Sequence, residues 1–353
     1  MLLEPVRLVL TGFGNVGRSF LDILLSNGEI LRDRYSLDPV VVGIADSSGS
    51  VFAPGGLDIP EILAHKRSGQ GLARHPTHGR PDLDGLALVQ VSDAHVLLEA
   101  TPTNLSDGQP GLAIVRAALA RGMHAVLASK GPLVIGFAEL TALSDAARPG
   151  APRLRFSGAV GGALPTINAG IRDLAGARIT RFEGVLNSTT QVLLGMMSEG
   201  RSWESALEHA RRTGITETDP TLDIDGWDAA NKLVIVANAV LRRPTALADV
   251  RVTGIREVSR VDLLRARAVG GRVSLLAVAE RIDDAGASRY ALRVGPAFLR
   301  RSHPLAHLSL DEMGAVYHTD IYGRLTIASA DQGPLGTAAA MLRDVIEVLA
   351  PGR

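Results

Sequence analysis

The chain has 353 residues, enough for two compact units or one elaborated α/β domain. Hydrophobic residues make up 46% and charged residues 21%, which indicates a soluble globular protein with a large core. The formal net charge is +0, so no basic field exists that would attract nucleic acid or anionic lipid. Cysteine is absent, which excludes disulfides, thiolate metal sites and a catalytic thiol.

The first residues run directly into an apolar segment and lack the layout of a signal peptide. The apolar run at 233–241 is too short to span a bilayer. We therefore expect a cytoplasmic protein with no membrane or nucleic-acid partner.

A glycine pattern follows the first predicted strand, at residues 6–10. Gly12, Gly14 and Gly17 give the spacing G-x-G-x-x-G, and a segment with helical periodicity comes next. In that context the glycines allow a tight turn and bring a pyrophosphate close to the helix N-terminus. The alternative is an ordinary glycine-rich turn. We predict a dinucleotide site formed by Gly12, Phe13, Gly14, Asn15, Val16 and Gly17.

The second predicted strand ends in Asp46. A carboxylate at this place accepts hydrogen bonds from the adenosine ribose, which favours NAD over NADP. Lys66 could still meet the 2′-phosphate of NADP, although the sequence favours a solvated loop cation there.

Two further strand–helix repeats follow. One strand runs into a polar turn at Thr101 and Asn104, and another delivers Lys130 at its carboxyl end. Ligands of open parallel sheets lie beyond the carboxyl ends of the strands, so Lys130 is placed to meet a nicotinamide or its substrate. A surface lysine in a loop is the alternative.

The character of the sequence changes after a proline- and glycine-rich joint at 147–152. Small residues at 156–167 form a bend whose carbonyls could hold a monovalent cation, although a tight connection is the simpler interpretation. Further on, polar residues at 187–190 precede a helix, where they cap it or meet a polar substrate.

An acidic stretch leads into a second helix, predicted for residues 226–241 with Asp225 as its N-cap. This helix is apolar nearly all round and should be buried. Asp228 and Lys232 are four residues apart and share one face. A buried ammonium needs a partner or must be neutral, so the pair is either an acid/base group or a structural ion pair.

Lysine is rare in this chain, with Lys66, Lys130 and Lys232 the only three among 37 cationic residues. Arginine cannot transfer a proton at neutral pH, which makes a retained lysine informative. The preceding loop adds Glu217, Asp219 and Asp223, which suit a substrate ammonium group or, alternatively, a divalent metal.

Several segments together resemble the homoserine dehydrogenase family. They are LTGFGNVGRSFL, LASKGPL, GAVGGALPTI, EGVLNSTTQVLL, TGITETDPTLDIDGWDAANKLVIVA, HPLAHL and GTAAAMLRDVIEV. The resemblance implies an α/β fold, with a Rossmann-type parallel-sheet domain at 1–150 and 314–353. It also implies an α+β catalytic and dimerisation domain at 151–313.

The implied activity is reversible NAD(P)H-dependent reduction of L-aspartate 4-semialdehyde to L-homoserine, a step toward threonine, methionine and isoleucine. By this resemblance Lys232 is the acid/base residue, Asp228 orients it, and Lys130 lies between cofactor and substrate. The implied substrate-binding residues are Glu217, Asp223, Thr189 and Gly214, with Glu217 on the amino group.

The resemblance also implies a homodimer and a sodium ion on the carbonyls of Ser157, Val160, Gly162 and Leu164. Gly333 stands where the family has a glycine-rich tail over the cofactor, although the flanking residues depart from that tail. The chain stops soon after its last predicted helix, so no appended amino-acid-sensing (ACT) domain is expected.

Two other functions compete. Another nicotinamide-dependent hydroxy-acid or amino-acid dehydrogenase would need a catalytic histidine, and His95, His124 and His209 form no clear constellation. A non-catalytic dinucleotide-sensing protein would keep the glycines but has no need of Asp228 and Lys232. A phosphorylating semialdehyde dehydrogenase is excluded because it needs a thiolate.

Overall fold

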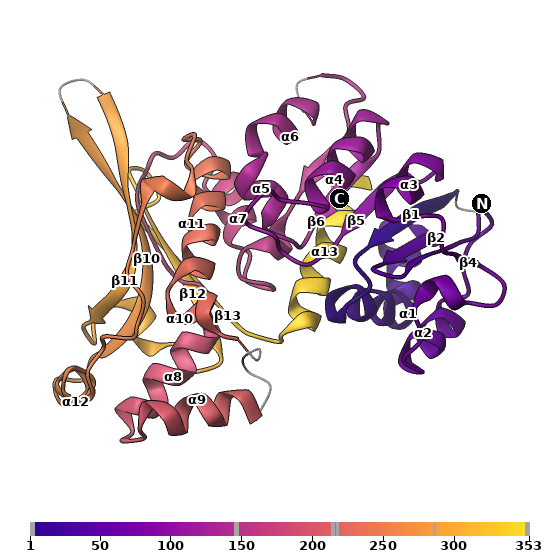
Figure 1. Cartoon of the computed structure of the whole chain (residues 1–353). Helices are drawn as coiled ribbons and strands as arrows, with labels where there is room; N and C mark the ends of the chain where they lie inside the picture. Colours follow the sequence, from indigo (N-terminus) through magenta and orange to yellow (C-terminus); the bar gives the residue numbers. More distant parts are fainter. Residues whose placement is uncertain (1–3, 145–147, 213–215, 217–218, 285–286, 350–353) are drawn as a thin grey trace. The chain divides into compact units, whose positions relative to one another are not determined.

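A computed structural model describes residues 4–144, 148–212, 216, 219–284 and 287–349. The chain forms two compact units, which Figure 1 colours along the sequence. The first consists of Met1–Gly162 and Gln332–Arg353, and the second of Ala163–Asp331.

The first unit contains a seven-stranded sheet with the order β4-β3-β2-β1-β5-β6-β7. Strands β2, β1, β5, β6 and β7 are parallel, whereas β3 and β4 pair antiparallel at one edge. β5 is buried throughout, which is typical of a parallel strand covered on both faces. The strands are β1 (Pro5–Thr11), β2 (Asp38–Asp46), β3 (Gly49–Phe52), β4 (Gly79–Arg80), β5 (Val96–Glu99), β6 (His124–Leu127) and β7 (Leu154–Arg155).

The helices of this unit follow the strands in a βα pattern. They are α1 (Asn15–Tyr35), α2 (Ile59–Arg67), α3 (Gly85–Val91), α4 (Gly111–Ala120), α5 (Gly131–Ile135), α6 (Phe137–Leu143) and α13 (Pro334–Leu349), with short turns η1 (Leu72–Arg74) and η2 (Ser157–Ala159). Helix α13 packs against α1, although the whole second unit precedes it in the chain (Figure 1). Its buried Met341 and Val345 share a core with Leu8 and Phe20.

The second unit contains a six-stranded sheet with the order β13-β12-β8-β10-β11-β9. Its pairs are antiparallel except β11 with β9. The strands are β8 (Ile179–Val185), β9 (Val250–Val252), β10 (Arg272–Asp284), β11 (Ala287–Leu299), β12 (Glu312–Thr319) and β13 (Arg324–Ala330). The helices are α7 (Thr166–Asn168), α8 (Ser188–Ser198), α9 (Trp203–Arg212), α10 (Thr221–Ile224), α11 (Trp227–Ala239) and α12 (Arg260–Ala268), with η3 (Ala169–Asp173), η4 (Leu247–Asp249) and η5 (Pro304–His307).

The predicted fold class is confirmed: a Rossmann-like parallel-sheet unit is joined to a second α+β unit. The chain passes from one unit to the other at different residues from those predicted. Residues 314–330 were expected in the nucleotide-binding domain, but they form most of β12 and all of β13 in the second sheet. β12 lies there because it pairs with β8, a strand far from it in sequence.

Helix α11 is buried as its apolar sequence predicts, but its first turn differs from the prediction. The N-cap is Gly226, with φ of 85°, and no side chain caps the helix. Asp225 instead ends α10, and its carboxylate lies 2.5 Å from Nε of Arg256. The prediction of Asp225 as the N-cap was therefore wrong, because a left-handed glycine separates it from the helix.

Candidate active site

The three glycines at the β1–α1 turn are required for different structural reasons. A Cβ on Gly12 would lie 2.2 Å from the Ala100 carbonyl oxygen, and one on Gly17 would lie 2.6 Å from the Gly12 oxygen. Gly14 has open space where its Cβ would be. Gly14 is the N-cap of α1 and supplies no side-chain cap, so the helix N-terminus is left to backbone N–H groups. This arrangement suits a pyrophosphate, which needs close backbone approach at a helix N-terminus.

The remaining residues of the predicted turn surround that opening. Phe13 is buried in the core of the first unit, Val16 packs against the same core, and Asn15 is exposed. The guanidinium of Arg18 donates to the Gly14 carbonyl at 3.3 Å and to Asn15 Oδ1 at 2.6 Å. Arg18 was not predicted as a site residue, although its position one turn into the helix lets its side chain reach back to Gly14.

Asp46 ends β2, as predicted, and is held by two partners. Its Oδ2 lies 2.5 Å from Lys66 Nζ, and its Oδ1 accepts from Ser48 N at 2.8 Å and Ser48 Oγ at 2.6 Å. Burial opposes the charge of Asp46, but the hydrogen bonds from Lys66 and Ser48 prevail and lower its pKa. Lys66 lies in α2, and its side chain is 24% exposed, so the prediction of a solvated loop cation was wrong.

A buried glutamate underlies the ends of β5 and β6. Glu99 is fully buried, and its carboxyl group accepts from Thr101 N at 2.9 Å and from the hydroxyls of Thr101 and Ser129. Burial raises the pKa of Glu99, and these hydrogen bonds only partly oppose that rise. Lys130 follows Ser129 directly and begins α5 as its N-cap, with its backbone N–H 3.5 Å from Thr103 Oγ1. Glu99 therefore ties together the two turns that carry Thr101 and Lys130.

In the second unit, Lys232 and Asp228 form a close pair on α11. Lys232 Nζ lies 2.6 Å from Asp228 Oδ2, and the two side chains are only 12% and 14% exposed. The same ammonium donates to the Leu186 carbonyl at 2.6 Å. An ammonium has three N–H donors, and these two contacts use two of them. Among the described residues no third acceptor contacts Lys232 Nζ.

Asn187 links this pair to a second carboxylate. Its Nδ2 donates to Asp223 Oδ1 at 2.7 Å and to Asp228 Oδ2 at 3.0 Å. Its Oδ1 caps α8 by accepting from Thr190 N at 2.9 Å, which confirms the predicted capping role. Burial and the charge of Asp228 raise the pKa of Asp223, and hydrogen bonds from Asn187 and Thr189 oppose this. This bridge between the two acids was not predicted, because Asn187 lies far from Asp223 and Asp228 in the sequence.

The other predicted substrate residues are placed only in part. Thr189 is buried in the first turn of α8. Asp219 is exposed, and its Oδ1 accepts from Thr221 N at 3.0 Å. Glu217 and Gly214 lie outside the described residues. Within the described residues, no three histidine or acidic side chains are grouped so that they could hold a metal ion.

The bend with the predicted sodium ligands spans the boundary of the two units. Ser157, Val160 and Gly162 belong to the first unit and Leu164 to the second. Asp344 on α13 accepts from Ser157 N at 2.7 Å and from its hydroxyl. The Leu164 carbonyl accepts from Thr166 N at 2.8 Å. Gly333 directly precedes α13 and has φ of 57°.

Comparison with known proteins identifies the family. The homoserine dehydrogenase family model matches residues 165–346. A homoserine dehydrogenase of Methanocaldococcus jannaschii is 32% identical, covering 97% of this chain and 98% of that relative. The chain belongs to the homoserine dehydrogenase family. The family predicted from the sequence is therefore confirmed.

Other relatives of the homoserine dehydrogenase family bear on the cofactor. An NAD(+)-dependent homoserine dehydrogenase of Pseudomonas canavaninivorans is 33% identical, covering 97% of this chain and 96% of that relative. A hyperthermophilic archaeal homoserine dehydrogenase solved with NADPH superposes with a TM-score of 0.82 at 26% identity, covering 98% of both chains. The family model of glutamate, leucine, phenylalanine and valine dehydrogenases matches residues 2–105. The prediction of an NAD(P)-dependent oxidoreductase is confirmed.

Among the described residues, no helix combines the length and the apolar character needed to cross a bilayer.

Proposed function

We propose that this chain catalyses the reversible NAD(P)H-dependent reduction of L-aspartate 4-semialdehyde to L-homoserine, with Lys232 as the acid/base group. The observation that carries the proposal is the ammonium of Lys232. It is nearly buried, it is held by Asp228 and the Leu186 carbonyl, and these partners leave one N–H for an incoming oxygen.

Reduction of an aldehyde places negative charge and then a proton on the carbonyl oxygen. A fixed cation beside that oxygen stabilises the charge, and a lysine can also give up the proton. Asp228 and Leu186 O hold Lys232 Nζ in one place, so little reorganisation is needed when charge develops. In the reverse direction the same amine accepts the proton of the homoserine hydroxyl. Lys130, at the carboxyl end of β6, would support the same oxygen or the ring of the cofactor.

The acidic residues would recognise the amino group of the substrate. We assign this role to Glu217, with Asp223, Thr189 and Gly214 around it. Asn187 supports the assignment because its amide donates to both Asp223 and Asp228 and so holds the two carboxyl groups near each other. Asp223 has a raised pKa and is therefore suited to form hydrogen bonds rather than to carry an isolated buried charge.

The residues of the first unit fit a dinucleotide. Gly14 leaves open space at the start of α1, where the pyrophosphate would lie, and Gly12 and Gly17 allow the close backbone contacts of the turn. The nicotinamide supplies or accepts the hydride when it is bound. Thr101, fixed by Glu99, would line the path between the two ends of the cofactor, and Gly333 would cover it.

We propose NAD as the preferred cofactor, because Asp46 offers a carboxylate to the ribose and would repel a 2′-phosphate. Lys66 moderates this preference, since its charge offsets that of Asp46 and could turn toward a phosphate. We expect measurable activity with NADP and a higher kcat/KM with NAD.

Three further properties belong to the same proposal. The carbonyls of Ser157, Val160, Gly162 and Leu164 would bind sodium, the working form would be a homodimer, and the protein would be cytoplasmic. Replacing sodium by a bulky organic cation at constant ionic strength tests the first, through activity and thermal stability. Light scattering of the purified chain tests the second.

A spectrophotometric assay tests the function itself. Purified protein with L-homoserine and NAD, or NADP, should reduce the cofactor, and L-2-hydroxy acids should not replace homoserine. Turnover of another hydroxy acid in its place would favour the rival dehydrogenase function. Cofactor binding without turnover would favour a sensing protein.

A further inference from the structure

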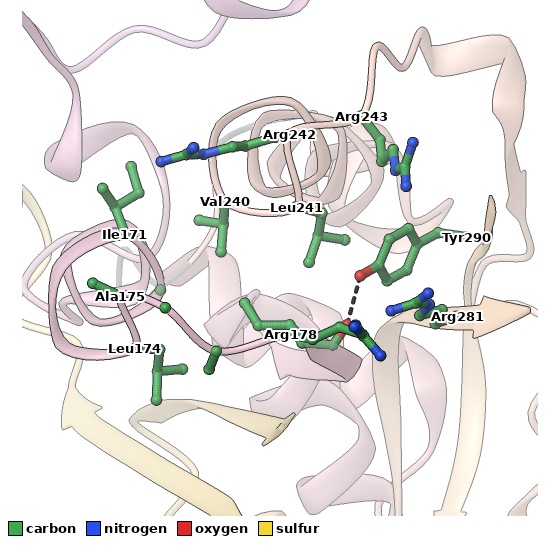
Figure 2. A pocket seen from close by; sticks show the side chains of 14 residues that line it. Ile171, Leu174, Ala175, Arg178, Val240, Leu241, Arg242, Arg243, Arg281 and Tyr290 are labelled. Carbon is green, nitrogen blue, oxygen red and sulfur yellow. Dashed lines mark hydrogen bonds between the residues drawn. The ribbon is translucent and has the colours of Figure 1, made fainter. Parts of the chain in front are cut away.

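A separate pocket lies in the second unit, near the C-terminal end of α11. Val240, just after this helix, is eight residues beyond Lys232, or about 12 Å at the helical rise. The pocket has a volume of ≈ 470 Å³ and opens between the segment after η3, the end of α11 and the β10–β11 hairpin (Figure 2). It is lined by Gly170, Ile171, Leu174 to Ile179, Val240 to Arg243, Arg281 and Tyr290, and we call it the arginine pocket.

Positive charge in the arginine pocket is concentrated around one aromatic ring. Figure 2 shows the side chains of Arg178, Arg243 and Arg281 gathered on the side of Tyr290, whose hydroxyl donates to the Ile179 carbonyl at 2.5 Å. Burial raises the pKa of Tyr290, and the charges of Arg281, Arg243 and Arg178 all act to lower it. All three guanidinium groups therefore act on the same small region.

Few acids offset this charge. Arg281 Nε lies 2.8 Å from Asp283 Oδ1, but the Asp283 side chain is 70% exposed. The Asp320 carboxylate accepts from the backbone N–H of Arg178, at 2.8 Å. Within the described part of the chain, no carboxylate pairs with the side chain of Arg178, Arg242 or Arg243. Guanidinium groups without a carboxylate partner, such as those of Arg178 and Arg243, attract an anion.

Arg242, which also lines the arginine pocket, has an unusual backbone conformation. Arg242 has φ of 52°, in the left-handed region where a helix end usually places glycine. The bond from Arg243 N to Ala237 O, at 3.0 Å, shows that this is the closing turn after α11. Arginine therefore stands where glycine would be less strained, and its side chain extends toward Ile171 on the other side of the pocket (Figure 2).

We propose that the arginine pocket binds a small organic phosphate. The phosphate would lie between the guanidinium groups of Arg178, Arg243 and Arg281, because a guanidinium matches two phosphate oxygens at once. The apolar part would lie against Leu174, Val240 and Leu241, which also line the pocket. A pocket of this size is usual for a small molecule. None of these residues belongs to the proposed catalytic set, so the inference does not depend on the proposed function.

Isothermal titration of the full chain with phenyl phosphate tests this, with inorganic phosphate as the second probe. We expect saturable binding of phenyl phosphate, tighter than that of inorganic phosphate because only the former fills the apolar side. Arg243→Ala and Arg178→Ala should each weaken binding at least about 10-fold, as expected for loss of a charged hydrogen-bond partner. Arg243→Lys should have a smaller effect, because it keeps the charge and loses the paired donors.

Two matched variants serve as controls. Arg265→Ala removes an exposed arginine of α12 that does not line the pocket, and it should bind phenyl phosphate like the native chain. Arg18→Ala reports on the glycine turn and reveals probe that binds at the cofactor site instead. The proposal is overturned if Arg243→Ala binds as tightly as Arg265→Ala, if only Arg18→Ala weakens binding, or if the native chain shows no saturable binding at millimolar probe. Arg178 and Arg243 are exposed, so their variants should fold, and thermal unfolding checks this.

Discussion

Two lysine–aspartate pairs, one in each unit, have almost the same distance between ammonium and carboxylate but lie in different surroundings. Lys66 Nζ lies 2.5 Å from Asp46 Oδ2, and Lys232 Nζ lies 2.6 Å from Asp228 Oδ2. Lys66 is 24% exposed, and within the described part of the chain the Asp46 carboxylate has Ser48 as its one further donor. Lys232 is 12% exposed and has a backbone carbonyl as a second acceptor, while Asp228 has Asn187 as a second donor.

The difference shows that an ion pair alone does not identify a catalytic lysine. The pair in the first unit joins α2 to the end of β2 and could be built with arginine. The pair in the second unit holds an amine at one buried point and leaves it a donor, which arginine could not use for proton transfer at neutral pH.

The largest expected difference between the two pairs appears when each lysine is replaced by arginine, because only Lys232 is proposed to transfer a proton. Lys232→Arg should fold and lose about 10³-fold in kcat, because charge is kept and proton transfer is lost. Lys66→Arg should keep kcat within about 3-fold, since a partly exposed pair tolerates either cation. Steady-state rates with homoserine measure both. Near-normal turnover of Lys232→Arg would refute its acid/base role.

Removing the acid from each pair should affect stability unequally. Asp228→Asn leaves a nearly buried ammonium without its anion and should cost about 3 kcal/mol in the free energy of unfolding. Asp46→Asn should cost about 1 kcal/mol, because solvent reaches Lys66. Urea unfolding of the three proteins measures this. Equal losses would mean that the two pairs differ less than their burial indicates.

Changing the charge at the end of β2 should alter cofactor choice and leave the chemistry intact. Asp46→Ser removes the repulsion of a 2′-phosphate and frees Lys66 to meet it, so the ratio of kcat/KM for NADP to that for NAD should rise about 10-fold. Ser48→Ala, which only removes a neighbour of Asp46, is the control and should change the ratio less. An unchanged ratio in Asp46→Ser would show that Asp46 does not contact the ribose of the cofactor.

The smallest effect concerns Glu99, a buried acid with hydroxyl and amide partners instead of a lysine. Its pKa is raised from the ordinary value of 4.5, so the folded chain keeps a proton that the unfolded chain has released. Unfolding then releases this proton, and the contribution of Glu99 to stability falls as pH rises above 4.5. Glu99→Gln should remove that decline relative to the native chain. Thermal unfolding between acid and neutral pH measures the difference, and parallel curves would contradict it.

Features set by neighbours in sequence were the predictable ones. The glycine turn at Gly12 and the pair Asp228–Lys232 depend on spacings of a few residues, which fix geometry within one turn or one helix. Contacts between distant segments were not predictable. The pairing of Lys66 with Asp46 depends on where α2 packs, and the bond of Asp344 to Ser157 depends on α13 returning to the first unit. The prediction of Asp225 as the N-cap failed for a local reason, because the left-handed Gly226 lies between Asp225 and the helix and is itself the N-cap.

The return of α13 to the first unit also sets an order of events during synthesis. The second unit is one continuous stretch, Ala163–Asp331, whereas the first needs Gln332–Arg353 to finish its core. At ordinary translation rates the stretch between the two parts takes about 10–30 s to emerge. Until then the apolar surface of α1 that Met341 and Val345 will cover faces water or a chaperone, so the part made first is the part completed last.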